Sequence, residues 1–309
     1  MIDPYHSGER AIQEMTGERD KAILNGRNIA GALSPRASGF LEQQQMCVLG
    51  WRSPAGDVWA SALAGRQGFA RARDDGATLA LRLDDDAHIL STGPPFAALQ
   101  VGDPLGVLFL DPSTRRRLRI NGRVADLHEH NLALAIDQAY PNCSKYIQQR
   151  SLAPAASSGK VGPREIETGD ALTAALRSWI GAADTFFVAS AHPDGAVDCS
   201  HRGGAPGFVR LHGDELRIPD YPGNSMFNTF GNFGLNPRAG LAFLDFAASR
   251  QLKLTGRVSL DLAAGKVDGD AHDTGGTGRW WTFKPIEWIV APLNLPMQWD
   301  FVEASPFNP

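Results

Sequence analysis

The sequence predicts a mainly β fold with some α-helix, in which two antiparallel barrels follow one another and pack as a pseudo-dimer. Short strand-like runs bounded by Gly, Pro or Asp recur about every ten residues, which is typical of barrels. The two halves of the chain also repeat each other. PAGDVWASALAGRQGF at 54–69 matches PDGAVDCSHRGGAPGF at 193–208, and GVLFLDPSTRRRLRINGRV at 106–124 matches GLAFLDFAASRQLKLTGRV at 240–258. Two blocks repeated in the same order indicate duplication of a β-rich unit.

The first half begins with a segment of mixed helical character and then changes to strands. The boundaries that we predict are an N-terminal helical arm at 1–39, a first barrel at 40–152, a linker at 153–168, and a second barrel with a C-terminal tail at 169–309. The linker is assigned because APAASSGKVG is rich in Ala, Ser, Gly and Pro.

Within these boundaries we expect the following elements. The arm has helical stretches at 9–15 and 17–24, and the first barrel has a hairpin around the turn SPAGD at 53–57, strands at 78–83, 104–110 and 117–124, and a helix at 132–140. The second barrel opens with a helix at about 170–180, N-capped within 168–170, and then repeats the hairpin.

The composition excludes several classes of partner. A net charge of −4 gives no broad basic field for nucleic acid or an anionic membrane. No apolar run approaches the roughly 20 residues that a membrane helix needs, and the charged N-terminus lacks the apolar core of a signal peptide. Cys47, Cys143 and Cys199 form no CxxC pair, which argues against a disulfide framework and a zinc ribbon. We therefore expect a cytoplasmic protein.

Within residues 220–258, a polar, Asn-rich loop that leads directly into two strand-like segments is the strongest functional signal. It carries short side chains that can hydrogen-bond a polar ligand, at Asn224, Ser225, Asn228, Thr229 and Asn232. A flat aromatic or phosphorylated ligand would suit it, and the alternative is an ordinary surface turn. In the first repeat, residues 83–104 stand where the second repeat has the Asn-rich loop, and their sequence is unrelated to it. We therefore expect one ligand site rather than two.

Other chemistries fit poorly. His128 and His130 flank Glu129, which gives no HExxH motif and supports no metal site. The chain has no Walker A motif, no GxGxxG between a strand and a helix, and no GxSxG. No His or carboxylate is clearly placed for proton transfer, so the catalytic residues stay unknown at this point.

Three segments of the second half carry a family resemblance: SHRGGAPGF at 200–208, the loop from 219 to 246, and LTGRV at 254–258. They resemble the FMN-binding split-barrel family related to pyridoxamine 5'-phosphate oxidase. PYHSGERAIQE at 4–14 and AYPNCSKYIQQR at 139–150 are similar to the tandem-barrel flavin-nucleotide-binding subgroup. The resemblance implies two split barrels with FMN bound non-covalently between them.

The resemblance also implies roles for residues of the second barrel. Arg202 would face the FMN phosphate as a bidentate partner, with the hydroxyl of Ser200 beside it; the alternative for Arg202 is a surface arginine at a strand end. The polar loop residues would hydrogen-bond the phosphate, the ribityl hydroxyls or the edge of the isoalloxazine: Asn224, Ser225, Asn228 and Thr229. Phe227 would pack on a ring face or, alternatively, plug the core.

From the first barrel, Asn142 and Lys145 would reach across to a cofactor held by the second barrel. The alternatives are a plain surface turn, or a lysine that activates the thiol of Cys143. Arg123 and Arg257 occupy matching places in the two repeats, which favours a structural role. The tryptophans of the C-terminal region either approach the flavin or bury area against a barrel: Trp280, Trp281, Trp288 and Trp299.

The function that we predict is that of an FMN-binding protein, a flavin-dependent oxidoreductase acting on an unidentified small molecule with NADH or NADPH as a candidate electron donor. The scarcity of acid–base residues fits, because hydride chemistry belongs to the cofactor. The alternatives are a non-catalytic flavin or haem carrier or sensor of the same fold, and a purely structural tandem barrel. Whether the chain also forms a homodimer stays open.

Overall fold

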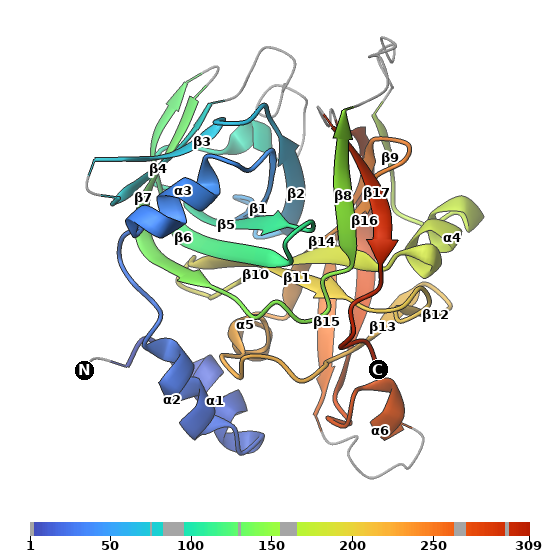
Figure 1. Cartoon of the computed structure of the whole chain (residues 1–309). Helices are drawn as coiled ribbons and strands as arrows, with labels where there is room; N and C mark the ends of the chain where they lie inside the picture. The colour runs from blue at the N-terminus through green and yellow to red at the C-terminus, as the bar shows by residue number, and fades with distance from the viewer. Residues whose placement is uncertain are drawn as a thin grey trace.

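The computed structural model describes residues 3–74, 76–82, 96–128, 131–154, 166–262, 270–293 and 297–309. Over these residues the chain forms two large antiparallel sheets, which lie side by side in Figure 1. The first has the order β2-β1-β5-β6-β7-β4-β3, made of β1 (Met46–Arg52), β2 (Val58–Ala64), β3 (Ala70–Arg73), β4 (Thr78–Arg82), β5 (Pro104–Asp111), β6 (Arg116–His128) and β7 (Asn131–Pro141).

The second sheet repeats this order as β11-β10-β14-β15-β16-β13-β12. Its strands are β10 (Thr185–Ala191), β11 (Val197–Gly203), β12 (Arg210–His212), β13 (Glu215–Pro219), β14 (Arg238–Asp245), β15 (Arg250–Asp261) and β16 (Trp280–Pro292), and β9 (Glu167–Gly169) pairs with β16. The equal strand orders confirm the predicted mainly β fold of two tandem split barrels packed as a pseudo-dimer.

The predicted hairpins form, and the first of them shows how the strands build two cores at once. On β1, Cys47, Leu49 and Trp51 face the core of the first barrel, whereas Met46 and Val48 face a second core shared with the other barrel. Successive side chains of a strand point to opposite faces, so a strand buried on both faces reads as a continuous apolar run. This explains why MCVLGW lacks a polar alternation.

The predicted helix at 132–140 is wrong, because these residues form strand β7. Leu132, Leu134 and Ile136 lie in the core of the first barrel with the two-residue period of a strand. β7 pairs with β6 on one side and β4 on the other. These pairings outweigh the helix propensity of Leu and Ala, which is worth only a few tenths of a kcal/mol per residue.

The segment before the second hairpin also differs from the prediction. Residues 167–169 form β9, so helix α4 (Ala174–Ala182) begins later than expected, and the predicted cap within 168–170 is wrong. Instead the side chain of Thr173 accepts a hydrogen bond from the backbone N–H of Leu176, at 3.3 Å. Strand pairing with β16 takes up the residues that would otherwise extend the helix.

The Asn-rich segment, predicted as loop, contains helix α5 (Asn228–Leu235). Gly231 and Gly234 lower its intrinsic helix propensity. Packing against the arm supports it: a Cβ on Gly231 would lie 2.6 Å from Cα of Glu9, and a Cβ on Gly8 would lie 2.3 Å from the carbonyl oxygen of Gly231. Only glycine permits so close a contact between helices.

The two barrels pack through their hairpins, each of which crosses the sheet of the other barrel. β2 lies on β14 and β15, and β11 lies on β5 and β6. Gly106 on β5 and Gly240 on β14, which occupy the same place in the two repeats, face the backbone of the opposing hairpin. The shared core between the barrels is apolar and includes Val48, Phe187 and Ala242.

The arm consists of α1 (Ser7–Met15), α2 (Arg19–Gly26) and α3 (Pro35–Leu41), in agreement with its predicted helical character. The hydroxyl of Tyr5 donates to the carbonyl of Ala22 at 2.7 Å and joins α1 to α2. In Figure 1, α1 and α2 lie below the barrels beside α5, and α3 lies against the first barrel.

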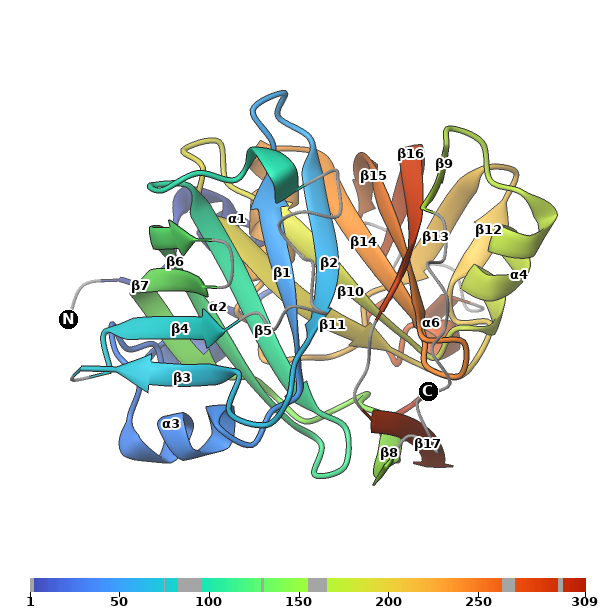
Figure 2. The same cartoon turned by 90° about the horizontal axis from the view of Figure 1, so that it is seen from above.

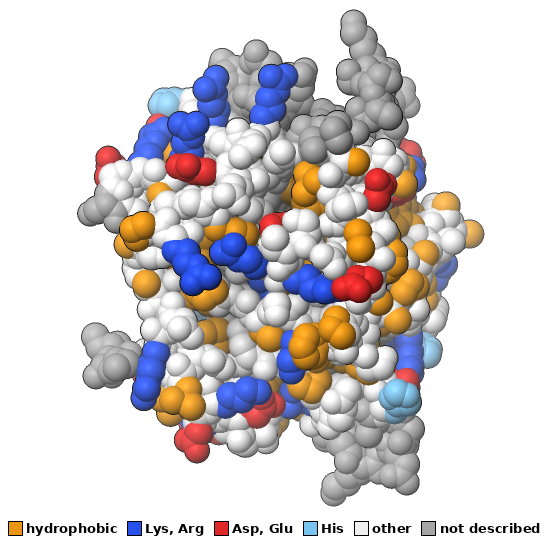
Figure 3. Space-filling view, viewed as in Figure 1, with side chains coloured by type: hydrophobic (Ala, Val, Ile, Leu, Met, Phe, Trp, Pro, Cys, Tyr) orange, Lys and Arg blue, Asp and Glu red, His pale blue; other side chains and the backbone are white. Residues whose placement is uncertain are grey.

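A two-stranded ribbon of β8 (Gln149–Pro154) and β17 (Met297–Glu303) lies apart from the large sheets in Figure 2. Arg150 on β8 binds both carboxylate oxygens of Asp184, at 2.7 and 2.8 Å, and so fixes the ribbon to the second barrel. Phe301 and Val302 on β17 are exposed, and hydrophobic side chains are visible over this side of the molecule in Figure 3. Two short helices complete the chain, η1 (Phe96–Ala98) and α6 (Asp270–Asp273).

The domain boundaries stay a prediction. Residues 155–165 of the predicted linker, 83–95 of the first-half segment, and Glu129 with His130 lie outside the described residues. None of the helices in the described ranges has the length and apolar character needed to cross a lipid bilayer.

Candidate functional site

A cavity between the barrels gathers the residues for which the family resemblance implied contact with a cofactor. Its lining includes Ser200, Arg202, Asn224, Ser225, Phe227, Asn228 and Thr229 from the second barrel, and Asn142 and Lys145 from the first. Asn232 of the Asn-rich loop is not among the lining residues and instead donates to Ser190 and Asp198. Other charged and ionisable side chains of this cavity were not predicted from the sequence: Arg117, Arg119, Tyr146, His201, Asp220, Tyr221 and Arg279. Whether these residues bind a cofactor stays a prediction.

Arg119 of β6 connects the two barrels at the floor of the cavity. Its guanidinium is buried and donates to the side-chain oxygen of Asn228 at 2.8 Å, to the Tyr140 hydroxyl at 2.9 Å and to the Ser200 hydroxyl. It also forms an ion pair with Asp198 at 3.4 Å. Because Asn228, Ser200 and Asp198 belong to the second barrel, the site exists only where the barrels meet.

Arg202 of β11 is a half-buried cation that lines the cavity. Its Nε is buried and has no hydrogen-bond partner among the described residues. The guanidinium carbon lies 5.9 Å from the centre of the Phe230 ring. Burial lowers the pKa of Arg202, and the nearby Arg119 and Arg279 add to this against the opposing effect of Asp220. An anion in the cavity would favour the charged form of Arg202.

Arg279 by contrast has two acidic partners. Its Nε donates to Asp220 at 2.9 Å and its Nη1 donates to Glu18 of the arm, also at 2.9 Å. The guanidinium carbon lies 5.1 Å from the centre of the Phe227 ring. Phe227 is half-buried, lines the cavity and packs against the core of the second barrel. Its packing on a flavin ring stays a prediction.

The loop before α5 is held in an uncommon backbone conformation. Ser225 and Phe227 have φ values of 62° and 57°, in the left-handed region that non-glycine residues rarely adopt. Side chains of the arm donate to the loop carbonyls: Gln13 to Met226 at 2.9 Å and Asn25 to Asn224 at 2.6 Å. The arm therefore fixes the loop that closes one side of the cavity.

The segment after β7 brings the first barrel to the same cavity. Asn142 accepts a hydrogen bond from the side chain of Asn224 at 3.2 Å, while its own amide nitrogen is buried and unpaired. Arg117 donates to the carbonyl of Cys143 at 2.6 Å. The ammonium of Lys145 lies 5.3 Å from the ring centre of Phe307. Asn142 and Lys145 therefore line the same cavity as residues of the second barrel, and their contact with a cofactor stays a prediction.

His201 is a buried neutral imidazole at the edge of the cavity. Arg117 donates to its Nδ1 at 3.1 Å, which places the ring proton on Nε2, and Nε2 is buried without a partner. Burial lowers the pKa of His201 well below its usual value, and the charges of Arg117, Arg202 and Arg150 add to this.

Other residues named from the sequence lie elsewhere. Arg123 and Arg257 are exposed at matching places on β6 and β15 and are not among the cavity residues. The tryptophans of the C-terminal region are buried outside the cavity lining, on β16 and β17: Trp280, Trp281, Trp288 and Trp299. Among the described residues no cluster of His, Cys, Asp and Glu could hold a metal ion.

The sequence of β6 contains a pattern that could have pointed to the arginines of the cavity. Arg117, Arg119 and Asn121 alternate with Leu118 and Ile120 on β6, so one face of this strand is polar. A polar strand face is normally assigned to solvent. Here it faces β11 of the second barrel, and only the packing of the two barrels reveals this.

Comparison with known proteins supports the family. Residues 172–271 match the family model described as pyridoxamine 5'-phosphate oxidase. No curated protein matches the chain.

The solved structures reported next each match a little over a third of this chain. HupZ of Group A Streptococcus is 16% identical, covering 37% of this chain and 89% of that chain with a TM-score of 0.30. HutZ, the haem storage protein of Vibrio cholerae, is 10% identical, covering 37% and 90% with a TM-score of 0.28. A pyridoxamine 5'-phosphate oxidase-related, FMN-binding protein of Nostoc punctiforme is 11% identical, covering 38% and 76% with a TM-score of 0.23.

Residues 172–271, which form most of the second barrel, are therefore similar to the pyridoxamine 5'-phosphate oxidase family.

Proposed function

We propose that the cavity binds FMN and that the protein is a flavin-dependent oxidoreductase acting on a small molecule, with NADH or NADPH as the candidate electron donor. One observation carries the proposal: the buried Nε of Arg202, in the cavity that the first turn of α5 also lines, has no hydrogen-bond partner among the described residues. A guanidinium binds a phosphate through paired hydrogen bonds. The N-terminus of a helix adds backbone N–H donors and a favourable dipole.

The unpaired atoms of the cavity fit such a ligand. They are donors on cavity-lining side chains, namely Arg202 Nε, Arg119 Nε, Asn142 Nδ2 and His201 Nε2. A buried donor without an acceptor is costly. FMN offers acceptor oxygens on its phosphate, ribityl chain and ring carbonyls, so it would satisfy donors of this kind.

The remaining lining residues would orient the ligand. Ser200 and Thr229, whose hydroxyl oxygens are 3.1 Å apart, form a polar wall beside Arg202. Phe227 and Phe230, with ring centres 6.4 Å apart, provide the apolar surface that a flat ring system requires. A bound flavin would supply the hydride transfer itself, and the protein would bind it, orient it and limit its contact with water.

A second candidate is a non-catalytic flavin or haem carrier or sensor. Burial raises the pKa of Tyr146 and of Tyr221 to about 12, and it lowers the pKa of His201 well below its usual value. These groups of the described cavity lining therefore exchange no protons near neutral pH. The loss of these three groups as proton donors or acceptors favours storage or sensing over a reaction that moves protons.

Titration with FMN and riboflavin tests the ligand. Arg202→Ala should weaken FMN binding about ten- to 150-fold, because a hydrogen bond to a charged group is worth about 1.5–3 kcal/mol. The same variant should change riboflavin affinity little, since riboflavin lacks the phosphate. Arg257→Ala, which removes an exposed arginine of the same barrel, is the matched control and should bind FMN like the wild type. Equal FMN affinity in Arg202→Ala and Arg257→Ala would contradict the phosphate role.

Turnover separates the enzyme from the carrier. The FMN-loaded protein should oxidise NADH or NADPH in the presence of a dye acceptor if it is an oxidoreductase. Stable binding of FMN or haem without oxidation of either nucleotide would favour the carrier, and a colourless protein that binds neither would refute both functions.

A further inference from the structure

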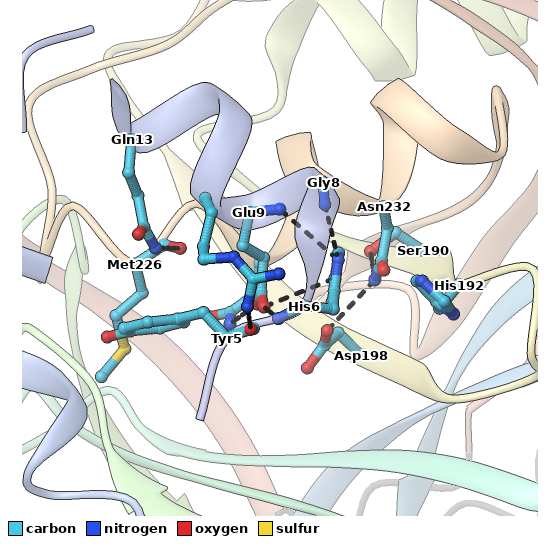
Figure 4. Close-up of polar contacts among 12 residues, drawn as sticks. Tyr5, His6, Gly8, Glu9, Gln13, Ser190, His192, Asp198, Met226 and Asn232 are labelled. Carbon is cyan, nitrogen blue, oxygen red and sulfur yellow. Dashed lines mark hydrogen bonds and ion pairs between the residues drawn. The ribbon is translucent and has the colours of Figure 1, made fainter. Parts of the chain in front are cut away.

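The arm places a buried carboxyl group directly behind the cavity. Glu9, in the first turn of α1, is 3% exposed. Its Oε2 accepts a hydrogen bond from the backbone N–H of His6 at 2.8 Å, and its Oε1 accepts one from the side-chain amide of Asn228 at 2.5 Å. Figure 4 shows Glu9 and His6 of the arm beside Asp198 and Asn232 of the second barrel. Glu9 is thus a residue of the arm that contacts a residue lining the cavity.

Asn228 connects Glu9 to Arg119. Because Arg119 donates to the side-chain oxygen of Asn228, the amide nitrogen of Asn228 must face Glu9. Glu9 is therefore separated from the guanidinium by a single amide group. Arg119 in turn donates to Ser200 in the cavity.

The charged surroundings of Glu9 disfavour its ionised form. Burial is the largest cause and the carboxylate of Asp198 on β11 the second, and together they raise the pKa of Glu9 to about 8 against the opposing effect of Arg119 on β6. Asp198 itself is well satisfied, accepting from Asn121 at 2.6 Å and from Asn232 at 3.1 Å. The other titratable groups near Glu9 are His6 at the N-cap of α1, His192 beside His6, Tyr5, and Tyr140 on β7.

His6 does not offset this charge. Burial lowers the pKa of His6, and its neighbour His192, whose ring centre is 4.6 Å away, lowers it further. Burial also raises the pKa of Tyr140, which is hydrogen-bonded to Arg119. Asn228 therefore lies between the guanidinium of Arg119 and the carboxyl group of Glu9. A negative charge arises beside Asn228 when Glu9 loses its proton.

We propose, on the basis of the anionic ligand in the proposed function, that Glu9 is a positioning residue of this site: it orients the Asn228 amide and Arg119 toward the cavity, and its negative charge, once formed, weakens the binding of an anion. The arm is then a functional part of the cofactor site as well as a packing element. The proposed effect of Glu9 is on the binding of the FMN phosphate and not on the affinity for a substrate.

The test is the dissociation constant of FMN measured by flavin fluorescence between pH 6.5 and 9.5. FMN affinity of the wild type should fall about three- to tenfold as the pH rises through 8, the effect of a single like charge near the site in a partly screened medium. A phosphate ester has its second pKa near 6, so the FMN charge is constant above pH 7. Riboflavin shares the ring and lacks the phosphate, so its affinity should not show this step.

Variants assign the step to Glu9. Glu9→Gln keeps an acceptor for the Asn228 amide and cannot ionise, so its FMN affinity should equal that of the wild type at pH 7 and stay constant to pH 9.5. Glu9→Ala removes the acceptor and should bind FMN more weakly at every pH. Glu14→Gln, an exposed residue of the same helix, is the control and should retain the wild-type pH profile.

The wild-type profile is decisive without any variant. FMN binding that is independent of pH, or a step that persists in Glu9→Gln, overturns the role of Glu9 and leaves FMN binding intact. Absence of FMN binding at every pH overturns the proposed function and the inference together.

Discussion

A single methyl group, introduced at Gly106 or at Gly240, measures how closely the two barrels are packed. A Cβ on Gly106 would lie 2.7 Å from the carbonyl oxygen of Val197, and a Cβ on Gly240 would lie 2.4 Å from Cα of Trp59. Both contacts are to backbone atoms of the opposing hairpin, which cannot rotate away as a flexible side chain would. The hairpin must therefore move.

We expect Gly106→Ala and Gly240→Ala each to lower the free energy of unfolding by about 1–3 kcal/mol, the usual cost of overpacking, with values toward the upper end. Equilibrium unfolding in urea measures this. The control is Gly181→Ala in α4, where a Cβ would meet no atom within 4 Å. Replacing a helical Gly by Ala at an open position should instead stabilise the protein by about 0.5–1 kcal/mol.

The two variants should differ in ligand binding despite their similar stability. Gly106 faces β11, whose following residues Ser200 and Arg202 line the cavity. Gly240 faces β2, which contributes no residue to the described cavity lining. Gly106→Ala should therefore weaken FMN binding at pH 7 and Gly240→Ala should not. Wild-type stability in both variants, or equal loss of FMN affinity in both, would refute this account of the interface.

Two further predictions concern buried charges. Burial lowers the pKa of Lys253 from 10.5 to about 8, so between these two pH values the unfolded state binds the proton more tightly than the folded state. Relative to Lys253→Met, the wild type should therefore gain about 3 kcal/mol of stability as the pH rises from 8 to about 10.5. Urea unfolding at several pH values measures this gain. Arg150→Ala leaves the partly buried carboxylate of Asp184 without its partner and should cost about 3 kcal/mol, measured in the same assay. The double variant Arg150→Met with Asp184→Asn should recover part of this loss.

The repeat in the sequence predicted the architecture because duplication constrains packing as well as local structure. Gly106 and Gly240 stand at corresponding positions in GVLFLD and GLAFLD, and both face the hairpin of the other barrel. Local composition was a weaker guide. The segment 132–140 is rich in Leu and Ala and was assigned to a helix, but its neighbours on both sides are strands.

The residues that line the cavity could be predicted where a local motif contains them, as in SHRGG and the Asn-rich loop. Arg119 and Arg279 could not, since they reach the cavity from β6 and from the residue before β16. Helix α5 was also missed, because contact with the arm, more than two hundred residues earlier in the chain, stabilises it. Long-range packing determines all these features.

The duplication also explains why we expect one cofactor per chain. In the second repeat, Gln251 and Lys253 take the places of Arg117 and Arg119. Gln251 uses its side chain on β2, accepting from the backbone N–H of Ala62 at 2.9 Å and donating to the carbonyl of Ala62 at 3.2 Å. Because the Gln251 amide is bonded to β2, it cannot donate to a ligand as the guanidinium of Arg117 could. At the other position, the buried ammonium of Lys253 replaces the Arg119 guanidinium that connects the barrels. The pseudo-equivalent position should therefore bind no FMN, and saturation at two FMN molecules per chain would contradict the argument.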